Sequence, residues 1–166
     1  MGLIDETLNY LRERRQNLLD GKVNCIPSPF KSFRQDFVGI EQETYYCVTA
    51  NQKAGKSQFA SFMFLYTPIM YAYKHPGKVR VRIFYAPFEE SERKVTLRFM
   101  RYLLYKHSGY RIRISQKELT STLEGHPVNE EILDLLESKE YKDIMNFFES
   151  HVTFLEDRNP TGIYKK

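Results

Sequence analysis

The sequence predicts an α/β domain in which helices flank a parallel sheet. Three observations predict this class. Short β-branched and aromatic stretches alternate with longer stretches of helical periodicity, a loop ending in Gly-Lys-Ser joins a predicted strand to a predicted helix, and the chain has no low-complexity tract. Strands that alternate with helices are connected by crossovers, which place the strands parallel. Of the 166 residues, 42% are hydrophobic, which is enough for a core.

Residues 2–19 form the first expected helix, because they carry a broken apolar stripe and Asp20 and Gly21 stop it. Two prolines, Pro27 and Pro29, then indicate an irregular loop. Residues 44–49 (TYYCVT) are short, aromatic and β-branched, which predicts a buried strand.

The second half alternates in the same way. We expect helices over residues 56–73, 92–107, 129–136 and 138–149, and strands over residues 79–88 and 151–155. Pro68 is expected to kink or end the first of these helices.

Charge, cysteine content and the lengths of the apolar runs indicate which ligands and which cell compartment to expect. The net charge of +4 and the pI near 9.0 favour nucleic acid or nucleotide. Two cysteines cannot build a disulfide framework, no pattern indicates zinc, and Cys47 is expected to be a buried apolar residue. No apolar run is long enough to span a membrane and the amino terminus is not a signal peptide, so we expect a cytoplasmic protein without a membrane partner.

The most informative motif follows the strand predicted over residues 44–49. It fits the phosphate-binding P-loop, or Walker A, pattern Gly/Ala-x4-Gly-Lys-Ser/Thr, in which backbone N–H groups and the start of a helix hold phosphate oxygens. Lys56 would bind the β- and γ-phosphates, and Ser57 would offer its hydroxyl to Mg²⁺. The alternative is a helix that merely begins after a glycine turn. The expected nucleotide-binding residues are Ala50, Asn51, Gln52, Lys53, Ala54, Gly55, Lys56, Ser57 and Gln58.

Glu89 is the candidate general base. It follows the strand predicted over residues 79–88, at the sheet edge where α/β proteins place ligands, and a carboxylate there can deprotonate an attacking water. The alternative is a solvated acidic turn. Asp157 and Arg158 follow the last strand at the same edge, where an ordinary exposed loop is the simpler interpretation.

These motifs resemble the ATPase domain of DnaB-type replicative helicases. Ile26-Pro27, Phe30, Gly39-Ile40 and Ala50 stand where that family has Ile-Pro-Thr-Gly-Phe, Gly-Leu and an Ala-first P-loop. Pro87-Phe88-Glu89-Glu90-Ser91 corresponds to Ser-Leu-Glu-Met-Ser, whose glutamate is the family's catalytic base. Phe154-Leu155-Glu156-Asp157 and Pro160-Thr161 resemble its next strand and loop. Gln52, Lys53 and Ala54 replace the usual Pro-Ser-Met, as in a divergent, phage-encoded member.

The resemblance implies a RecA-like P-loop NTPase, with a linker helix in residues 1–21 and the N-terminal portion of the ATPase domain in residues 22–166. It implies ATP and Mg²⁺ as cofactors, Lys56 and Glu89 as catalytic residues, and unwinding of DNA by a hexameric ring in a bacterial or phage-infected cell. We expect the chain to be truncated before the Walker B strand, so that the arginine finger and most contacts with single-stranded DNA lie elsewhere. Residues 1–166 alone are therefore expected to bind nucleotide weakly and to hydrolyse almost none.

Two other functions fit the P-loop. One is a small-molecule kinase, which would use the basic stretch 98–113 as an arginine-rich lid, although that stretch fits a helix with a solvated basic face better. The other is a non-catalytic module that binds nucleotide to hold an assembly together.

Overall fold

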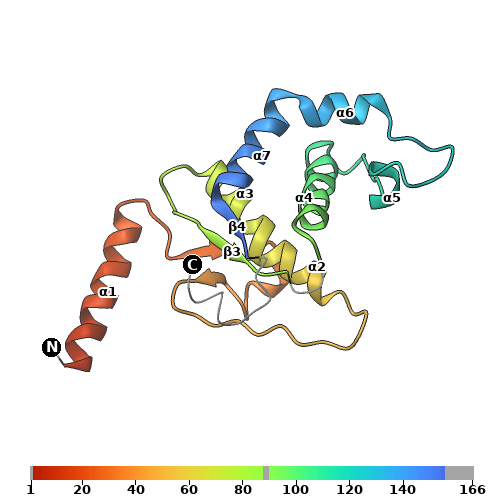
Figure 1. Ribbon diagram of the computed structural model, residues 1–166. Coiled ribbons are helices and arrows are strands. Elements are labelled where there is room, and N and C mark those ends of the chain that lie inside the picture. Colours follow the sequence, from red (N-terminus) through yellow and green to blue (C-terminus); the bar gives the residue numbers. More distant parts are fainter. Residues whose placement is uncertain (1, 88–89, 156–166) are drawn as a thin grey trace. The chain divides into compact units, whose positions relative to one another are not determined.

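The computed structural model describes residues 2–87 and 90–155 of the chain (Figure 1). The architecture is mixed α/β and mostly helical, with two small two-stranded sheets, one antiparallel and one parallel. The chain divides into two compact units, Met1–Val81 and Arg82–Lys166, which are described in turn.

The first unit begins with helix α1 (Leu3–Leu19), which confirms the helix predicted over residues 2–19. The helix ends as expected, because Gly21 adopts the left-handed conformation with a φ of 73° and the Lys22 amide donates to the Asn17 carbonyl at 2.8 Å. None of its residues is buried, so α1 contributes nothing to the core of the first unit.

A short antiparallel pair follows where the sequence predicted an irregular loop. Strand β1 (Cys25–Pro27) pairs with β2 (Gly39–Glu41), with Ile26 opposite Ile40, and the short 3-10 helix η1 (Lys31–Phe33) lies in the connection. Pro27 cannot donate a ladder hydrogen bond, and it stands at the end of its strand. Position 39 requires glycine, because a Cβ atom there would collide with the Ile26 carbonyl group.

The strand predicted over residues 44–49 is not formed. These residues adopt no regular secondary structure, and their backbone groups make no hydrogen bond to the backbone of any described residue. A buried strand needs neighbouring strands to satisfy its amides and carbonyls. Tyr45 is 89% exposed and Cys47 is also exposed, so the expectation of a buried Cys47 was wrong as well.

The helix predicted over residues 56–73 is present in three consecutive pieces: α2 (Lys56–Ala60), the π-helical stretch η2 (Ser61–Tyr66) and α3 (Thr67–Lys74). Pro68 does not end the helix. It has no N–H to donate, and the wider turns of η2 precede it, with the Thr67 hydroxyl donating to the Phe62 carbonyl at 2.7 Å. The buried side chains of this helix include Met63, Leu65, Ile69 and Met70.

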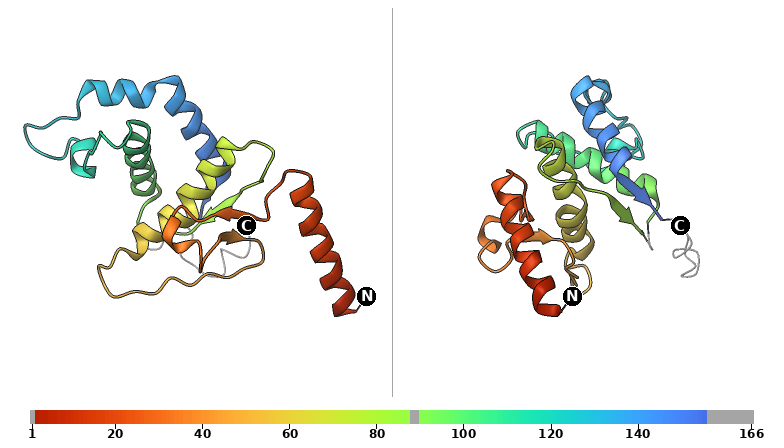
Figure 2. Two further views of the ribbon diagram at one scale, coloured as in Figure 1. Left: turned by 180° about the vertical axis from the view of Figure 1, so that it is seen from behind. Right: turned by 90° about the vertical axis from the view of Figure 1, so that its left-hand side faces the viewer.

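The second unit contains the parallel pair. Ile83 pairs with Val152 and Tyr85 with Phe154, so the two strands run side by side although most of the unit separates them in sequence. Figure 2 shows the last helix running directly into the second strand of this pair. The elements are β3 (Ile83–Tyr85), α4 (Glu92–His107), α5 (Gln116–Leu119), α6 (Glu130–Glu137), α7 (Lys139–His151) and β4 (Val152–Phe154).

These bounds confirm the helices predicted over residues 92–107, 129–136 and 138–149 and the last strand. The strand predicted over residues 79–88 is only three residues long within the described part, and α5 was not predicted. The core joins α4 to α7, where the Phe99 and Phe148 rings stack with centroids 4.2 Å apart. The fully enclosed side chains of this core are Val95, Phe99, Leu103, Leu104 and Ile144.

Candidate functional site

The loop of residues 50–57 leads directly into α2, as the P-loop interpretation requires. Gly55 is the residue before the helix and has left-handed backbone angles, φ 86° and ψ 17°. Lys53 is also left-handed, with a φ of 60°, and the Ala54 amide donates to the Asn51 carbonyl at 3.3 Å. The loop is therefore tightly turned, and glycine stands at the sharpest position, where its missing Cβ removes the steric penalty.

Lys56 closes this loop. Its ammonium group donates to the carbonyl oxygen of Ala50 at 2.8 Å. This hydrogen bond connects Lys56, near the end of the motif, to the first residue of the motif. The side chain is exposed, so its charge stays near water and can exchange this carbonyl for a better acceptor. Phosphate oxygens are such acceptors, because charge-assisted hydrogen bonds are about twice as strong as neutral ones.

The start of α2 carries backbone amides that donate to no described residue. Phe59 is the first residue whose amide bonds within the helix, to the Gly55 carbonyl at 2.9 Å. The amides of Gly55, Lys56 and Ser57 donate to no described residue, as expected for a helix start. Residues 50–58 include two lysines and no acidic residue, so the loop carries positive charge at the end of the helix that favours anions.

Ser57 and Gln58 complete the predicted set. Both are exposed, and the Ser57 hydroxyl forms no hydrogen bond with a described residue. Mg²⁺ is commonly held by few protein oxygens together with phosphate oxygens and water, so a single hydroxyl fits the role proposed for Ser57. Within residues 2–87 and 90–155, no three His, Cys, Asp or Glu side chains gather closely enough to hold a metal ion themselves.

Aromatic side chains hold the start of the helix against the hairpin segment. Phe30 stacks on Phe59 with ring centroids 5.4 Å apart and planes inclined by 7°, and it meets Phe62 edge-on at 5.4 Å. Phe30 contributed to the prediction only through the family resemblance. Its position three residues after Pro27 did not indicate that its ring would pack against Phe59 and Phe62.

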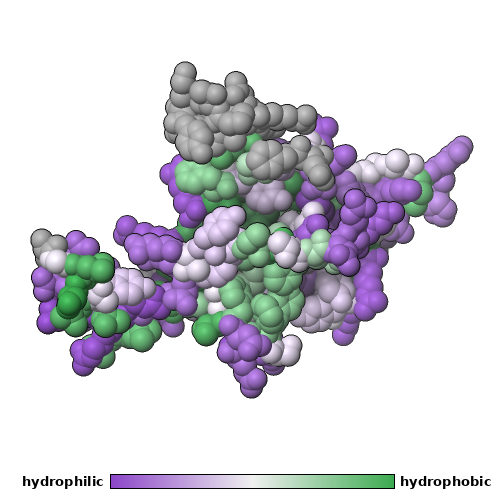
Figure 3. Space-filling view, turned by 90° about the horizontal axis from the view of Figure 1, so that it is seen from below, coloured by the Kyte–Doolittle hydropathy of each residue, from purple (hydrophilic) through white to green (hydrophobic). Residues whose placement is uncertain are grey.

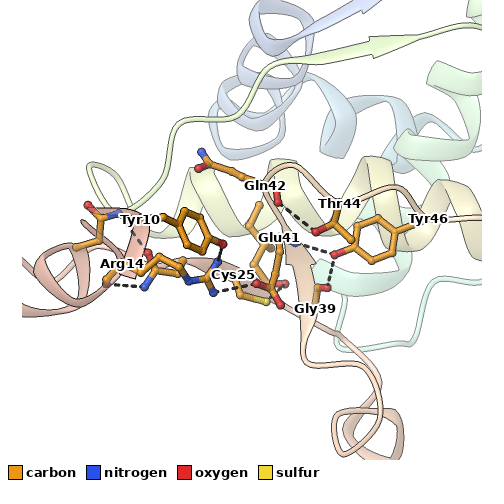
Figure 4. Close-up of polar contacts among 11 residues, drawn as sticks. Tyr10, Arg14, Cys25, Gly39, Glu41, Gln42, Thr44 and Tyr46 are labelled. Carbon is orange, nitrogen blue, oxygen red and sulfur yellow. Dashed lines mark hydrogen bonds and ion pairs between the residues drawn. The ribbon is translucent and has the colours of Figure 1, made fainter. Parts of the chain in front are cut away.

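Tyr46 makes a second connection although its segment is not a strand. Its hydroxyl donates to the Gly39 carbonyl at 3.2 Å and accepts from the Glu41 amide at 2.9 Å, and its ring lies 5.5 Å from that of Phe64 (Figure 4). The Tyr46 side chain therefore connects the segment before the loop of residues 50–57 to both β2 and η2. This contact replaces some of the support that strand pairing would give.

Glu89 lies outside the described residues, and so do Asp157 and Arg158. The next residue, Glu90, is described, and its carboxylate forms a two-pronged ion pair with the guanidinium group of Arg98 on α4. A carboxylate occupied in this way is a poor general base. The carboxylate of Glu90 therefore has a role in joining the segment before α4 to Arg98 of that helix.

Helix α1 is attached to the first unit by polar contacts. The Arg14 guanidinium donates to Glu41 of β2 at 2.8 Å and to the Tyr10 hydroxyl at 2.7 Å, as Figure 4 shows. These contacts raise the pKa of Arg14 above its ordinary value, chiefly through the Glu41 hydrogen bond. Asn24 also donates to the Arg14 carbonyl at 2.7 Å.

The apolar stripe of α1 is uncovered. Apolar and hydrophilic side chains lie next to each other on its surface at the left of Figure 3. Leu3 is 80% and Ile4 75% exposed, and the same stripe continues through the other exposed leucines, Leu8, Leu11, Leu18 and Leu19.

Across residues 2–87 and 90–155, no helix combines the length and the apolar character that crossing a membrane demands. The chain was also compared with models of protein families, with curated proteins and with solved structures, and nothing matches in any of the three comparisons.

Proposed function

We propose that residues 50–58 bind the triphosphate of ATP and that the chain is the nucleotide-binding part of a RecA-like, DnaB-type DNA helicase. The observation that carries this proposal is the closure of the loop by Lys56 on Ala50, directly before a helix whose first amides donate to no described residue. A glycine turn that merely starts a helix does not require a lysine folded back over the loop.

Each residue has a specific task in this function. The amides of Gly55, Lys56 and Ser57 donate to phosphate oxygens, and the Lys56 ammonium moves from the Ala50 carbonyl to the β- and γ-phosphates. Ser57 offers its hydroxyl to Mg²⁺, which neutralises charge on the phosphates. Glu89 accepts a proton from the water that attacks the γ-phosphorus atom, while ADP leaves.

The wider proposal is that ATP hydrolysis moves a hexameric ring along single-stranded DNA in the cytoplasm of a bacterium or a phage-infected cell. The uncovered leucines of α1 support assembly, because a linker helix in such a ring needs an apolar face for a neighbouring copy.

Calorimetric titration with ATP in the presence of Mg²⁺ tests the nucleotide site directly. Lys56→Ala removes the main side-chain countercharge, so the dissociation constant should rise at least tenfold, roughly 1.4 kcal/mol. Lys74→Ala is the matched control, because it removes an exposed lysine from the far end of the same helix. Equal affinities of parent and Lys56→Ala would exclude this loop as the phosphate site.

Steady-state phosphate release distinguishes the helicase from the two other functions. A helicase should release phosphate faster when single-stranded DNA is added, a kinase should need a small-molecule acceptor, and an assembly module should bind ATP without turnover. These outcomes apply to a protein that also contains a Walker B strand and an arginine finger, and in such a protein binding without turnover under all conditions would leave only the last function.

A further inference from the structure

The second unit contains a segment in which all charged side chains are basic. Residues 94–117 include no aspartate or glutamate, whereas the chain as a whole carries a net charge of only +4. The cations of this segment are Lys94, Arg98, Arg101, Lys106, Arg111, Arg113 and Lys117.

The fold turns this segment back on itself. After α4 ends, the Ser108 hydroxyl accepts hydrogen bonds from the amides of Arg111 and Ile112, at 3.1 and 2.8 Å. Gly109 and Tyr110 both take left-handed backbone angles, with φ values of 63° and 70°. The chain therefore reverses within a few residues.

The returning chain then lies beside α4. The Arg101 guanidinium donates to the Ile114 carbonyl at 2.8 Å across thirteen residues of sequence. Figure 2 shows α5, which follows this return, close to α4. Cations from the helix and from the returning chain consequently share one surface.

Tyrosines stand among these cations. The Tyr105 and Tyr110 rings meet edge to face with centroids 5.0 Å apart, Arg113 lies over Tyr105 at 5.7 Å, and Lys106 lies over Tyr110 at 4.9 Å. We call Tyr105, Lys106, Tyr110, Arg111 and Arg113 the basic-aromatic cluster.

The cluster is at the surface, and its cations have no ion-pair partner within residues 2–87 and 90–155. Tyr110 is 50% exposed, and Lys106, Arg111 and Arg113 are exposed too. Elsewhere on α4, Arg98 pairs with Glu90 and His107 with Glu140. By contrast, no carboxylate in the described part of the chain forms an ion pair with a cation of the cluster.

We propose that the basic-aromatic cluster binds single-stranded nucleic acid. Proteins that bind single strands combine cations that follow the phosphates with aromatic rings on which unpaired bases stack. Cations that now rest on tyrosine rings can turn toward phosphates, and this frees ring faces for bases. An acidic protein surface would use the cations, whereas a single strand also places its unpaired bases on exposed rings such as that of Tyr110. The inference goes beyond the ATP site and does not depend on it.

Fluorescence anisotropy of a labelled oligothymidylate of twenty nucleotides, titrated with the 166-residue chain, tests whether binding requires the cations of the cluster. Arg111→Glu/Arg113→Glu should weaken binding at least tenfold. Replacing Arg111 and Arg113 with alanine instead should lower the salt-dependence slope by about 1.4, since each contact contributes about 0.7 for a single strand. Lys139→Glu/Lys142→Glu is the matched control, because it makes the same change of charge on exposed residues of α7. Equal losses in both charge-reversed proteins would overturn the proposed location.

Tyr110 tests the stacking requirement. Tyr110→Ala should weaken binding about tenfold, within the range for one stacked base, whereas Tyr110→Phe keeps the ring and should bind within about twofold of the parent. Thermal melts followed by circular dichroism establish that each variant is folded. An unchanged affinity of Tyr110→Ala would overturn the proposal.

Competition identifies the class of ligand. Poly-glutamate that displaces the oligothymidylate at equal charge concentration would instead assign the cluster to an acidic protein surface, and equal binding of a duplex would also overturn the proposal. Lys56→Ala should bind the oligothymidylate as the parent does, so a failed ATP site and a failed nucleic-acid site give different results.

Discussion

The ammonium group of Lys56 and the carbonyl oxygen of Ala50 lie 2.8 Å apart, so one exposed side chain spans the whole turn that precedes α2. A single exposed hydrogen bond contributes little to folding. Lys56→Ala should therefore lower the free energy of unfolding by about 1 kcal/mol or less, as measured by urea denaturation. A much larger loss would mean that the weaker ATP binding expected for this variant reflects unfolding of the loop.

Ser57 should matter only when Mg²⁺ is present. Ser57→Ala removes one oxygen ligand, and losing a contact to a charged group typically costs about 1.5 kcal/mol, so affinity for Mg-ATP should fall roughly tenfold. Affinity for ATP measured in EDTA should be unchanged. Equal losses with and without Mg²⁺ would assign the hydroxyl to the phosphates instead.

Glu89 and Glu90 should differ although they are neighbours. In a protein that also contains a Walker B strand and an arginine finger, Glu89→Gln keeps the shape but cannot accept a proton from water, so the rate of ATP hydrolysis should fall by about 10²–10⁴-fold with ATP affinity nearly unchanged. Glu90→Gln leaves the proposed base in place and weakens only the pair with Arg98. Initial-rate assays on both variants decide which carboxylate is the base, and the reverse pattern would transfer that role to Glu90.

The leucine stripe of α1 should support assembly rather than folding. Leu11→Ser/Leu18→Ser replaces two exposed side chains, so the melting temperature should hardly change while the mass in solution falls, measured by light scattering. Arg12→Ser/Arg15→Ser changes the polar side chains of the same helix and serves as the control. Removal of residues 1–20 with no change in the number of chains per particle would contradict the docking role.

The two cysteines should react at different rates. Cys47 is exposed, whereas burial raises the pKa of the partly buried Cys25 thiol. The thiolate is the reactive form, so iodoacetamide should modify Cys47 first at pH 8. The neutral Cys25 thiol is favoured by folding, so its contribution to stability is present below the ordinary thiol pKa and is lost as the pH rises toward the raised value. Mass spectrometry of timed samples measures both rates, and faster modification of Cys25 would contradict its burial.

Helices were predictable from the sequence because their signals are local. The apolar residues Val95, Phe99 and Leu103 recur at helical spacing, and the structure buries them together on α4. The P-loop motif was predicted in the same way, since the tasks proposed for it depend on adjacent residues such as Gly55 and Lys56. These features need no distant partner to be recognised.

Features that depend on distant residues were not predictable. The segment around Tyr45 has the composition of a buried strand, but composition cannot supply neighbouring strands, and Tyr45 is exposed. The basic stretch 98–113 was visible, but nothing in its spacing indicated that Arg101 would hold the returning chain at Ile114. The sequence therefore located these cations without indicating that they share a surface with Tyr110.

The π-helical stretch η2 contains one residue more than the continuous helix α2–η2–α3 needs for α-helical winding. A wide turn of this kind carries an extra residue compared with α-helix of the same rotation. Shortening η2 by one residue would thus restore α-helical winding and leave Ile69 facing as it does. The same deletion within α2 would rotate everything that follows by about 100°. Deletion of one residue from this helix should therefore be tolerated at Ser61–Tyr66 far better than next to Lys56.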